Sequence, residues 1–222
     1  MGVRAHFADR REGGRRLADE LTPYAGRSDV VVLGLPRGGV PVAFEVANAL
    51  RAPLDVFVVR KLGVPGHEEL AMGAIASGGV RVLNRDVVEA NRVGPEEVER
   101  VTQRELETLS RQERRFRGER PPIEVKDRTA IAVDDGLATG ATMRAAVTAL
   151  RELGAAAIVV AVPTAPRETC EALRSLADEV VCATTPDPFM AVGLWYADFT
   201  PVMDEEVQSV LLGRDPGVDA DR

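Results

Sequence analysis

The chain has 222 residues, of which 45% are hydrophobic and 28% are charged, and its formal net charge is −7. This balance supports a packed core and excludes a disordered chain, and the negative charge argues against non-specific binding of nucleic acid. No apolar run approaches the roughly 18 residues of a membrane span, and the charged N-terminal segment lacks the apolar stretch of a signal peptide.

The cysteines are few and carry no recognisable pattern. Cys170 and Cys182 are the only two, and neither belongs to a C-x-x-C pair. A zinc site or a disulfide framework therefore lacks its usual signature. We expect two reduced, mostly buried thiols, as in a cytosolic protein.

The first part of the chain alternates between helical and strand patterns. Four elements are predicted, in the order helix, strand, helix, strand: 10–25, 29–35, 40–50 and 54–59. Both strands are near-continuous apolar runs, which is typical of strands buried on both faces. The segment PRGG follows the first strand, and Lys61 comes at the end of the second.

The middle of the chain is less regular. Residues 62–79 are rich in glycine, and we predict a mobile loop there with a possible short strand at 71–76. A third strand is predicted at 80–84. Residues 95–116 then form a long, highly charged helix whose few apolar positions share one face. Its arginines alternate with glutamates, which favours a solvated face with ion pairs over an RNA-binding patch.

Regular alternation returns in the last part of the chain. The predicted elements are strands at 129–133, 156–162 and 179–183 and helices at 140–153, 166–176 and 204–212. An irregular aromatic segment at 184–203 interrupts them. Strands that alternate with helices indicate a parallel α/β sheet, and ligands bind such sheets at the carboxyl ends of the strands.

One of these strand ends carries an unusual motif. The apolar strand that begins the segment 131–143 leads directly into Asp134 and Asp135. Two adjacent acids beside a dry sheet cost stability, and a ligand with several hydroxyl groups, or a cation, would offset that cost. Both carboxylates can accept hydrogen bonds from neighbouring ribose hydroxyls.

The next residues provide the complementary half of a site. Ala138, Gly140 and Ala141 are small enough to leave backbone N–H groups open, while Thr139 and Thr142 add hydroxyl donors. The positive end of the following helix suits a phosphate dianion. Acids for a sugar and N–H groups for a phosphate predict a ribose 5-phosphate site.

The segment 131–143 closely resembles the signature of type I phosphoribosyltransferases, which use phosphoribosyl diphosphate (PRPP). The order of elements extends this resemblance over about 28–203, and LPRGGVPVA, VRKLGVPGHEELAMGAI and PFMAVGLWY are similar to a group of uncharacterised bacterial members. The resemblance implies one α/β domain over 1–222, a three-layer parallel sheet with a small C-terminal hood and a helical insertion. We expect the core at 28–183, a helical arm at 94–120, the hood at 184–203 and a frayed tail at 213–222.

The resemblance also assigns the loop after the first strand to the diphosphate. In the family this loop binds through backbone groups and often contains an unusual cis peptide. Here it consists of Pro36, Arg37, Gly38 and Gly39. Two glycines allow exposed N–H groups, and a guanidinium can bind phosphate oxygens in a fork. Lys61 occupies a position where the family often has a basic residue facing the diphosphate.

The glycine-rich segment 62–79 resembles the family's flexible lid, which excludes water from the reaction. Within it, Glu68 or Glu69 is a candidate general acid or base towards the nucleobase, and we favour Glu68. His67 is the third candidate because imidazole titrates near neutrality. Solvated loop residues without a catalytic role are the alternative for each of them.

Two features bear on the acceptor base. Enzymes for 6-oxopurines usually have Asp where this chain has Ala138, so the sequence weakens a hypoxanthine or guanine assignment without establishing adenine. Four of the nine Phe, Trp and Tyr residues lie within 189–199, and a base could stack on Phe189 or Trp195. A small hood core or a dimer contact would explain the same cluster.

The resemblance thus implies a cytoplasmic, homodimeric enzyme that transfers ribose 5-phosphate from PRPP to a nitrogenous base, with a purine as one candidate. Asp134 and Asp135 would hold the ribose and a magnesium ion (Mg2+), the expected cofactor. The alternative is a regulatory protein that binds PRPP or a nucleotide on the same fold without turnover. P-loop, dinucleotide-fold and nucleophile-elbow motifs are absent from the sequence.

Overall fold

A computed structural model describes residues 6–213, and its centre is a parallel sheet of five strands in the order β2-β1-β6-β7-β8. The strands are β1 (Val30–Gly34), β2 (Leu54–Val56), β6 (Thr129–Val133), β7 (Ala157–Thr164) and β8 (Glu179–Thr184). β1 pairs with β6 over its whole length, from Val30 opposite Thr129 to Gly34 opposite Val133. The predicted α/β class and parallel sheet are confirmed.

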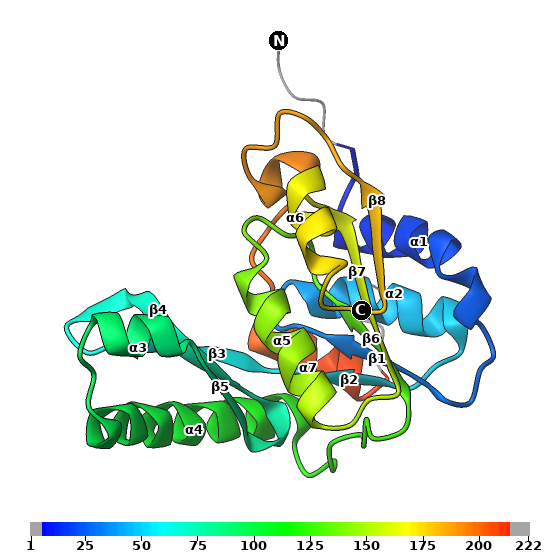
Figure 1. Cartoon of the computed structure of the whole chain (residues 1–222). Helices are drawn as coiled ribbons and strands as arrows, with labels where there is room; N and C mark the ends of the chain where they lie inside the picture. The colour runs from blue at the N-terminus through cyan, green and yellow to red at the C-terminus, as the bar shows by residue number, and fades with distance from the viewer. Residues whose placement is uncertain (1–5, 214–222) are drawn as a thin grey trace.

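Helices cover both faces of this sheet (Figure 1). One face packs against α1 (Arg10–Glu20) and α2 (Gly39–Leu50), and the other against α5 (Ala141–Glu152) and α6 (Arg167–Leu173). Neighbouring strand residues alternate between the two cores, as Val32 faces α2 and Leu33 faces α5. This alternation explains the uninterrupted apolar runs of the sequence, because both faces of each strand are buried.

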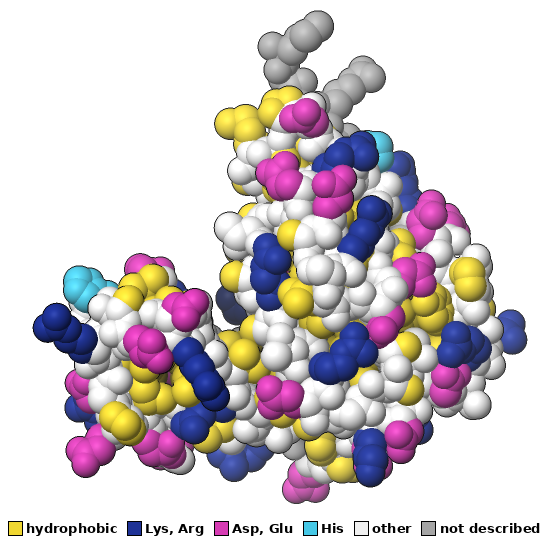
Figure 2. Space-filling view, in the orientation of Figure 1, with side chains coloured by type: hydrophobic (Ala, Val, Ile, Leu, Met, Phe, Trp, Pro, Cys, Tyr) yellow, Lys and Arg dark blue, Asp and Glu magenta, His cyan; other side chains and the backbone are white. Residues whose placement is uncertain are grey.

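A small lobe projects from the edge of the core (Figures 1 and 2). It contains an antiparallel sheet of β3 (Val59–Val64), β4 (His67–Ala76) and β5 (Val80–Leu83), with α3 (Arg85–Ala90) and α4 (Pro95–Arg117) packed on it. The last helix, α7 (Asp204–Leu211), packs against α4 and α2. Short 3-10 turns lie at Thr22–Tyr24, Ser77–Gly79 and Val192–Trp195.

The lobe corrects three predictions. Residues 62–79 form most of a β-hairpin in place of a mobile loop, the second parallel strand ends at Val56, and the strand at 80–84 belongs to the small sheet. Glycines caused the first error. A Cβ atom on Gly63 would lie 2.6 Å from the Glu68 carbonyl oxygen, and one on Gly73 would lie 2.4 Å from that of Val82. These glycines permit close strand approach and a bulge.

The cysteine prediction is also wrong. Cys170 on α6 and Cys182 on β8 form a disulfide, with their Cα atoms 6.9 Å apart. The strand-helix-strand crossover brings the two residues together, which their separation of 12 positions could not indicate. The predicted tail lies almost wholly outside the described residues. None of the helices described combines the length and apolar character that a membrane span requires.

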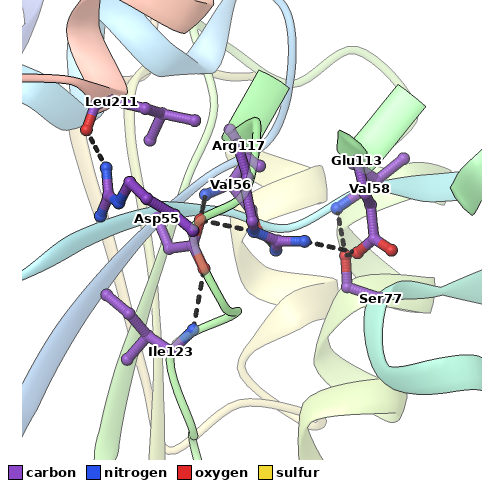
Figure 3. Close-up of polar contacts among 9 residues, drawn as sticks. Asp55, Val56, Val58, Ser77, Glu113, Arg117, Ile123 and Leu211 are labelled. Atoms are coloured by element: carbon purple, nitrogen blue, oxygen red, sulfur yellow. Dashed lines mark hydrogen bonds and ion pairs between the residues drawn. The ribbon is translucent and has the colours of Figure 1, made fainter. Parts of the chain in front are cut away.

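A buried ionic network joins the lobe to the core (Figure 3). Arg117, near the end of α4, donates to Asp55 of β2 at 2.8 Å, to Glu113 at 2.9 Å and to the Val56 carbonyl oxygen at 2.7 Å. Ser77 donates its hydroxyl to the same Glu113 oxygen at 2.6 Å. Burial would lower the pKa of Arg117, but its two carboxylate partners outweigh that effect and raise it.

We therefore expect Arg117→Met to destabilise the protein by about 3–5 kcal/mol, because the Asp55 carboxylate would stay buried without its partner. Arg114→Met is the matched control on the exposed side of the same helix. Urea unfolding followed by circular dichroism measures both changes. Equal losses in the two variants would contradict the structural role of this network.

Candidate functional site

The loop after β1 packs directly on the acid pair that follows β6. A Cβ atom on Gly38 would lie 2.0 Å from Asp135 Oδ2, and one on Gly39 would lie 2.6 Å from the Val133 carbonyl oxygen. Gly38 has φ −61°, which any residue can adopt, so space and not conformation requires glycine there. The Pro36–Arg37 peptide bond is cis, as the family resemblance implies. The two predicted loops therefore form one site.

The surroundings of Asp134 and Asp135 favour one negative charge on the pair over two. The Asp135 N–H donates to Asp134 Oδ1 at 2.8 Å. Burial, and then the charge of Asp135, raise the pKa of Asp134 well above its usual range. Burial also raises the pKa of Asp135, although Arg10 opposes the shift. We infer that Asp135 carries the charge and that Asp134 holds the proton first as the pH falls.

Arg10 is a member of the site that the sequence did not reveal. Its Nε donates to Asp135 Oδ2 at 2.8 Å, and its Nη1 donates to the Thr200 carbonyl oxygen at 2.8 Å. The guanidinium also stacks on the ring of Phe199, 3.8 Å from its centroid. Arg10 begins α1, 125 positions before its partner, and no local pattern distinguishes it from the neighbouring arginines.

Tyr196 of the hood is a second residue that sequence reasoning missed. Its hydroxyl donates to the Asp135 backbone oxygen at 2.5 Å, and burial raises its pKa. Phe7 packs against the Tyr196 ring at 5.4 Å and pairs with its backbone. The aromatic cluster was the only signal, and it did not identify this contact. Segments near both ends of the described chain thus meet at Asp135.

The predicted phosphate loop occupies the start of α5. Gly140 adopts φ 71° and precedes the helix. Behind the loop, Thr169 donates its hydroxyl to the Ala138 carbonyl oxygen at 2.8 Å, which fixes the turn. Thr139, Ala141 and Thr142 are exposed. Because the first N–H groups of a helix have no acceptor within it, this loop can bind an anion at the end of the sheet.

The structure places the two predicted basic residues, Arg37 and Lys61, in different parts of the molecule. Arg37 lies in the loop beside the acids and is exposed, 3.5 Å from Asp204. Lys61 does not end a parallel strand, because it lies within β3 of the lobe, where its ammonium contacts Glu69 at 3.2 Å. The early end of β2 explains this correction. Binding of diphosphate by either residue stays a prediction.

The candidate acid-base residues lie away from the acid pair. His67, Glu68 and Glu69 begin β4 at the hairpin turn, at the outer end of the lobe (Figure 1), and all three are exposed. N–H groups of the Glu68 and Gly66 backbones lower the pKa of Glu68, so its carboxylate is ionised at neutral pH. The structure does not bring these residues together with Asp134 and Asp135.

The predicted base-binding aromatics contact each other. Phe189 and Trp195 stack with their ring centroids 6.1 Å apart and their planes 24° apart. Among the residues at 6–213, the buried Trp195 Nε1 has no hydrogen-bond partner. Met190 beside them is 75% exposed, so the hood offers an open apolar surface. Stacking of a base there stays a prediction.

The acids are the candidate ligands for Mg2+. Within 6–213 there is no group of three or more His, Cys, Asp or Glu side chains that could hold a metal. Asp134 Oδ2 and Asp135 Oδ1 accept no hydrogen bond from the described residues. Two such oxygens fit an ion that keeps several waters and binds mainly through substrate phosphates, which is the usual state of Mg2+.

Comparison with known proteins agrees with this geometry. The family described as phosphoribosyl transferase domain matches residues 8–197. Two Mycobacterium tuberculosis proteins, from strains CDC 1551 / Oshkosh and H37Rv, are 51% identical over 205 residues, and their own assignment as phosphoribosyl transferases is inferred. The match covers 92% of this chain and 46% of theirs, so the chain spans about half the length of these relatives.

Solved structures extend the comparison to the fold. The protein TT1426 from Thermus thermophilus is 44% identical, with a TM-score of 0.82, over 94% of this chain and 98% of that one. The AQ2163 protein from Aquifex aeolicus is 10% identical, with a TM-score of 0.51, over 91% of this chain and 84% of that one. At that identity the second match shows the fold alone.

The glycine loop allows a graded test. Gly39→Ala would force backbone atoms apart and should cost about 1–3 kcal/mol of stability. Gly38→Ala meets the carboxyl group of Asp135, a side chain that can move, so it should cost less while it displaces Asp135 from Arg10. Urea unfolding gives the order, with Gly94→Ala as the control in open space. The reverse order would contradict the packing described.

The raised pKa of Asp134 predicts that Asp134→Asn stabilises the protein. At a pH below the usual aspartate value near 3.8, both states hold the proton and the residue costs nothing. Above that pH the unfolded chain loses the proton first, so the contribution of Asp134 to stability falls until the folded pKa is passed.

At pH 7 the variant should unfold at a higher Tm than the wild type, because the cost of ionising Asp134 in the folded state is removed. Unfolding measured from pH 3 to pH 8 should show the gain disappear at the acidic end. Asp86→Asn, on an exposed helix of the lobe, is the control. A gain that is independent of pH would rule out this cause.

Proposed function

The chain belongs to the phosphoribosyl transferase domain family, and from this premise we propose that it transfers ribose 5-phosphate from PRPP to a nitrogenous base with release of diphosphate. One observation carries the proposal. The acid pair at the end of β6 lies against the glycine loop after β1 and is followed directly by the phosphate loop of α5. Sugar, diphosphate and phosphate sites thus adjoin.

Each part of PRPP has a proposed partner. Asp134 and Asp135 accept hydrogen bonds from the ribose hydroxyls. The N–H groups and hydroxyls of 139–142, with the turn at Ala138, bind the 5-phosphate. The loop 36–39 binds the diphosphate through its backbone, with Arg37 as the cation in the loop and Lys61 as a second cation that the lobe would have to bring to it. This division follows charge, since acids face the neutral hydroxyls and N–H groups face the anions.

In the proposed reaction the bond from C1 of ribose to the diphosphate oxygen breaks, and a bond from C1 to a ring nitrogen of the base forms. Positive charge develops on the ribose as the diphosphate leaves. The carboxylates beneath the ring stabilise this charge without reorganisation, because the loop packing already fixes them. Glu68 is the proposed acceptor of the proton from the base, and it would need the hairpin to close over the site.

Asp134 and Asp135 would hold a Mg2+ ion, whose chemistry would be to supply positive charge against the diphosphate. The chain's own residues hold the sugar and exclude water around it. A purine is the proposed base class, with Ala138 disfavouring 6-oxopurines and Phe189 and Trp195 as stacking partners. A homodimer and a cytoplasmic location rest on the family resemblance alone.

The contact of Arg10 with Asp135 favours a second candidate function. In the structure one oxygen of the proposed ribose acid is already paired with a guanidinium that is 11% exposed. A protein that binds PRPP or a nucleotide without turnover would tolerate such a pairing, whereas an enzyme must shift it or use the other oxygen. Turnover therefore separates the two candidates.

Asp135→Asn should lower diphosphate release by at least about 100-fold, because the neutral amide loses most of its interaction with the developing charge. The measurement uses PRPP, magnesium and a panel of purine and pyrimidine bases with the wild-type chain and the variant. Asp86→Asn should retain wild-type rates. Full activity in Asp135→Asn would exclude the role assigned to this acid. PRPP binding by calorimetry, with no release for any base, would favour the regulatory candidate.

A further inference from the structure

A second cavity lies where the lobe meets the core, and the proposed reaction does not use it. Its volume is about 580 Å³, within the range of sites that bind small molecules. The end of β2, the turn Ser77–Gly79, the second half of α4 and the segment 122–126 enclose it. No residue of the acid pair, the glycine loop or the phosphate loop lines it.

Helix α5 separates this cavity from the phosphate site. The phosphate loop precedes Ala141, the first residue of α5, while Leu153, directly after the last, lines the cavity. Twelve residues of α-helix span about 18 Å at the standard rise. A molecule in the cavity therefore does not occupy the place of PRPP.

The walls of the cavity are mainly apolar. The apolar lining comes from both sides of the joint: Leu33, Phe57, Leu106, Leu109, Val125 and Leu153. Hydrophobic side chains are visible where the lobe meets the core in Figure 2. These surfaces suit a ring or another compact apolar body, and Leu106 and Leu153 are the leucines among them that are only partly buried.

The polar groups of the cavity carry an excess of negative charge. Asp55 and Glu113 both line it, and Arg117 is the cation between them. Glu113 Oε1 accepts from Ser77 and Arg117, and Glu113 Oε2 accepts from no described residue (Figure 3). The Glu113 side chain is 20% exposed, so this second oxygen is an available acceptor.

The guanidinium, by contrast, has little to offer a ligand. Arg117 uses Nε, Nη1 and Nη2 on Asp55, Glu113 and the Val56 carbonyl oxygen, and its side chain is 7% exposed. An anion would meet two carboxylates and a largely buried guanidinium that already pairs with both of them. Lys126 and Glu124 at the exposed edge cancel each other in charge.

We propose that this cavity binds a small organic cation with a ring-sized apolar body, whose N–H groups donate to the Glu113 carboxylate. The apolar body lies against Leu106 and Leu153. The site is separate from the PRPP site, so the proposal stands whether or not the chain is an active transferase.

Benzamidine is a suitable probe because it joins a single ring to a cationic pair of N–H donors. Isothermal titration with the whole chain compares it with neutral benzamide and anionic benzoate. We expect benzamidine to bind the wild type, benzamide to bind about tenfold more weakly, and benzoate not to bind.

Two variants locate the probe. Glu113→Gln keeps an oxygen for Ser77 and Arg117 but removes the charge, and should weaken benzamidine binding about tenfold. Ser110→Phe places a ring in the cavity and should abolish binding. Glu107→Gln is the control, since this residue lies on the same helix, is exposed and does not line the cavity. Sulfate binding at the phosphate loop should stay unchanged in all three variants.

The outcomes decide the proposal. Absence of benzamidine binding to the wild type, equal binding of benzoate, or undiminished binding in Glu113→Gln would each overturn it. Binding that survives in a folded Ser110→Phe variant would place the probe elsewhere and overturn it as well. If Ser110→Phe does not fold, the comparison of Glu113→Gln with Glu107→Gln, made with both benzamidine and benzamide, decides the result.

Discussion

The burial of two adjacent carboxylates at the end of β6 is the constraint on which the rest of the site depends. The Asp135 side chain occupies the space beside Gly38, and the backbone of Val133 and Asp134 occupies the space beside Gly39, so glycine fits best at both positions. Their charge calls for a cation, and Arg10 supplies it from α1. Tyr196 holds the Asp135 backbone from the hood. The arrangement of the N-terminal helix and the hood therefore follows from one pair of acids.

Much of this core could be predicted because its signals are local. Strands buried on both faces read as continuous apolar runs, and the predicted strand at 129–133 coincides with β6. The acids and the phosphate loop are consecutive in the sequence, so their proximity needed no knowledge of the tertiary fold. Arg10 and Tyr196 could not be found in this way, since their contacts with Asp135 span 125 and 61 positions.

Glycines caused the main errors in predicting the fold from the sequence. Glycine is common in mobile loops, but it is also required where ordered backbones approach closely. Gly38 and Gly39 yield space to a neighbouring loop, whereas the sequence suggested a role in exposing N–H groups. Gly63 and Gly73 yield space to neighbouring strands in an ordered hairpin, which from sequence alone looks the same as a mobile loop. The wrong prediction that Lys61 ends a parallel strand follows from this error. With the hairpin formed, Lys61 belongs to the lobe and contacts Glu69, so of the two predicted basic residues only Arg37 lies in the loop beside the acids.

Charged groups are also buried where the lobe meets the core, which we call the joint. Their burial costs stability there too, but with a different result. Arg117 and its carboxylates replace what could be an apolar contact, and a buried ion pair seldom stabilises more than packed hydrophobic side chains of the same size. At β6 an equivalent cost maintains the acids that we propose bind the ribose. At the joint, the Glu113 oxygen that Arg117 leaves unpaired is the feature that an apolar contact would not provide. Glu113 Oε1 serves the joint by accepting from Arg117 and Ser77, whereas Oε2 has no partner among the described residues beside the cavity, and this asymmetry is what points to a ligand there.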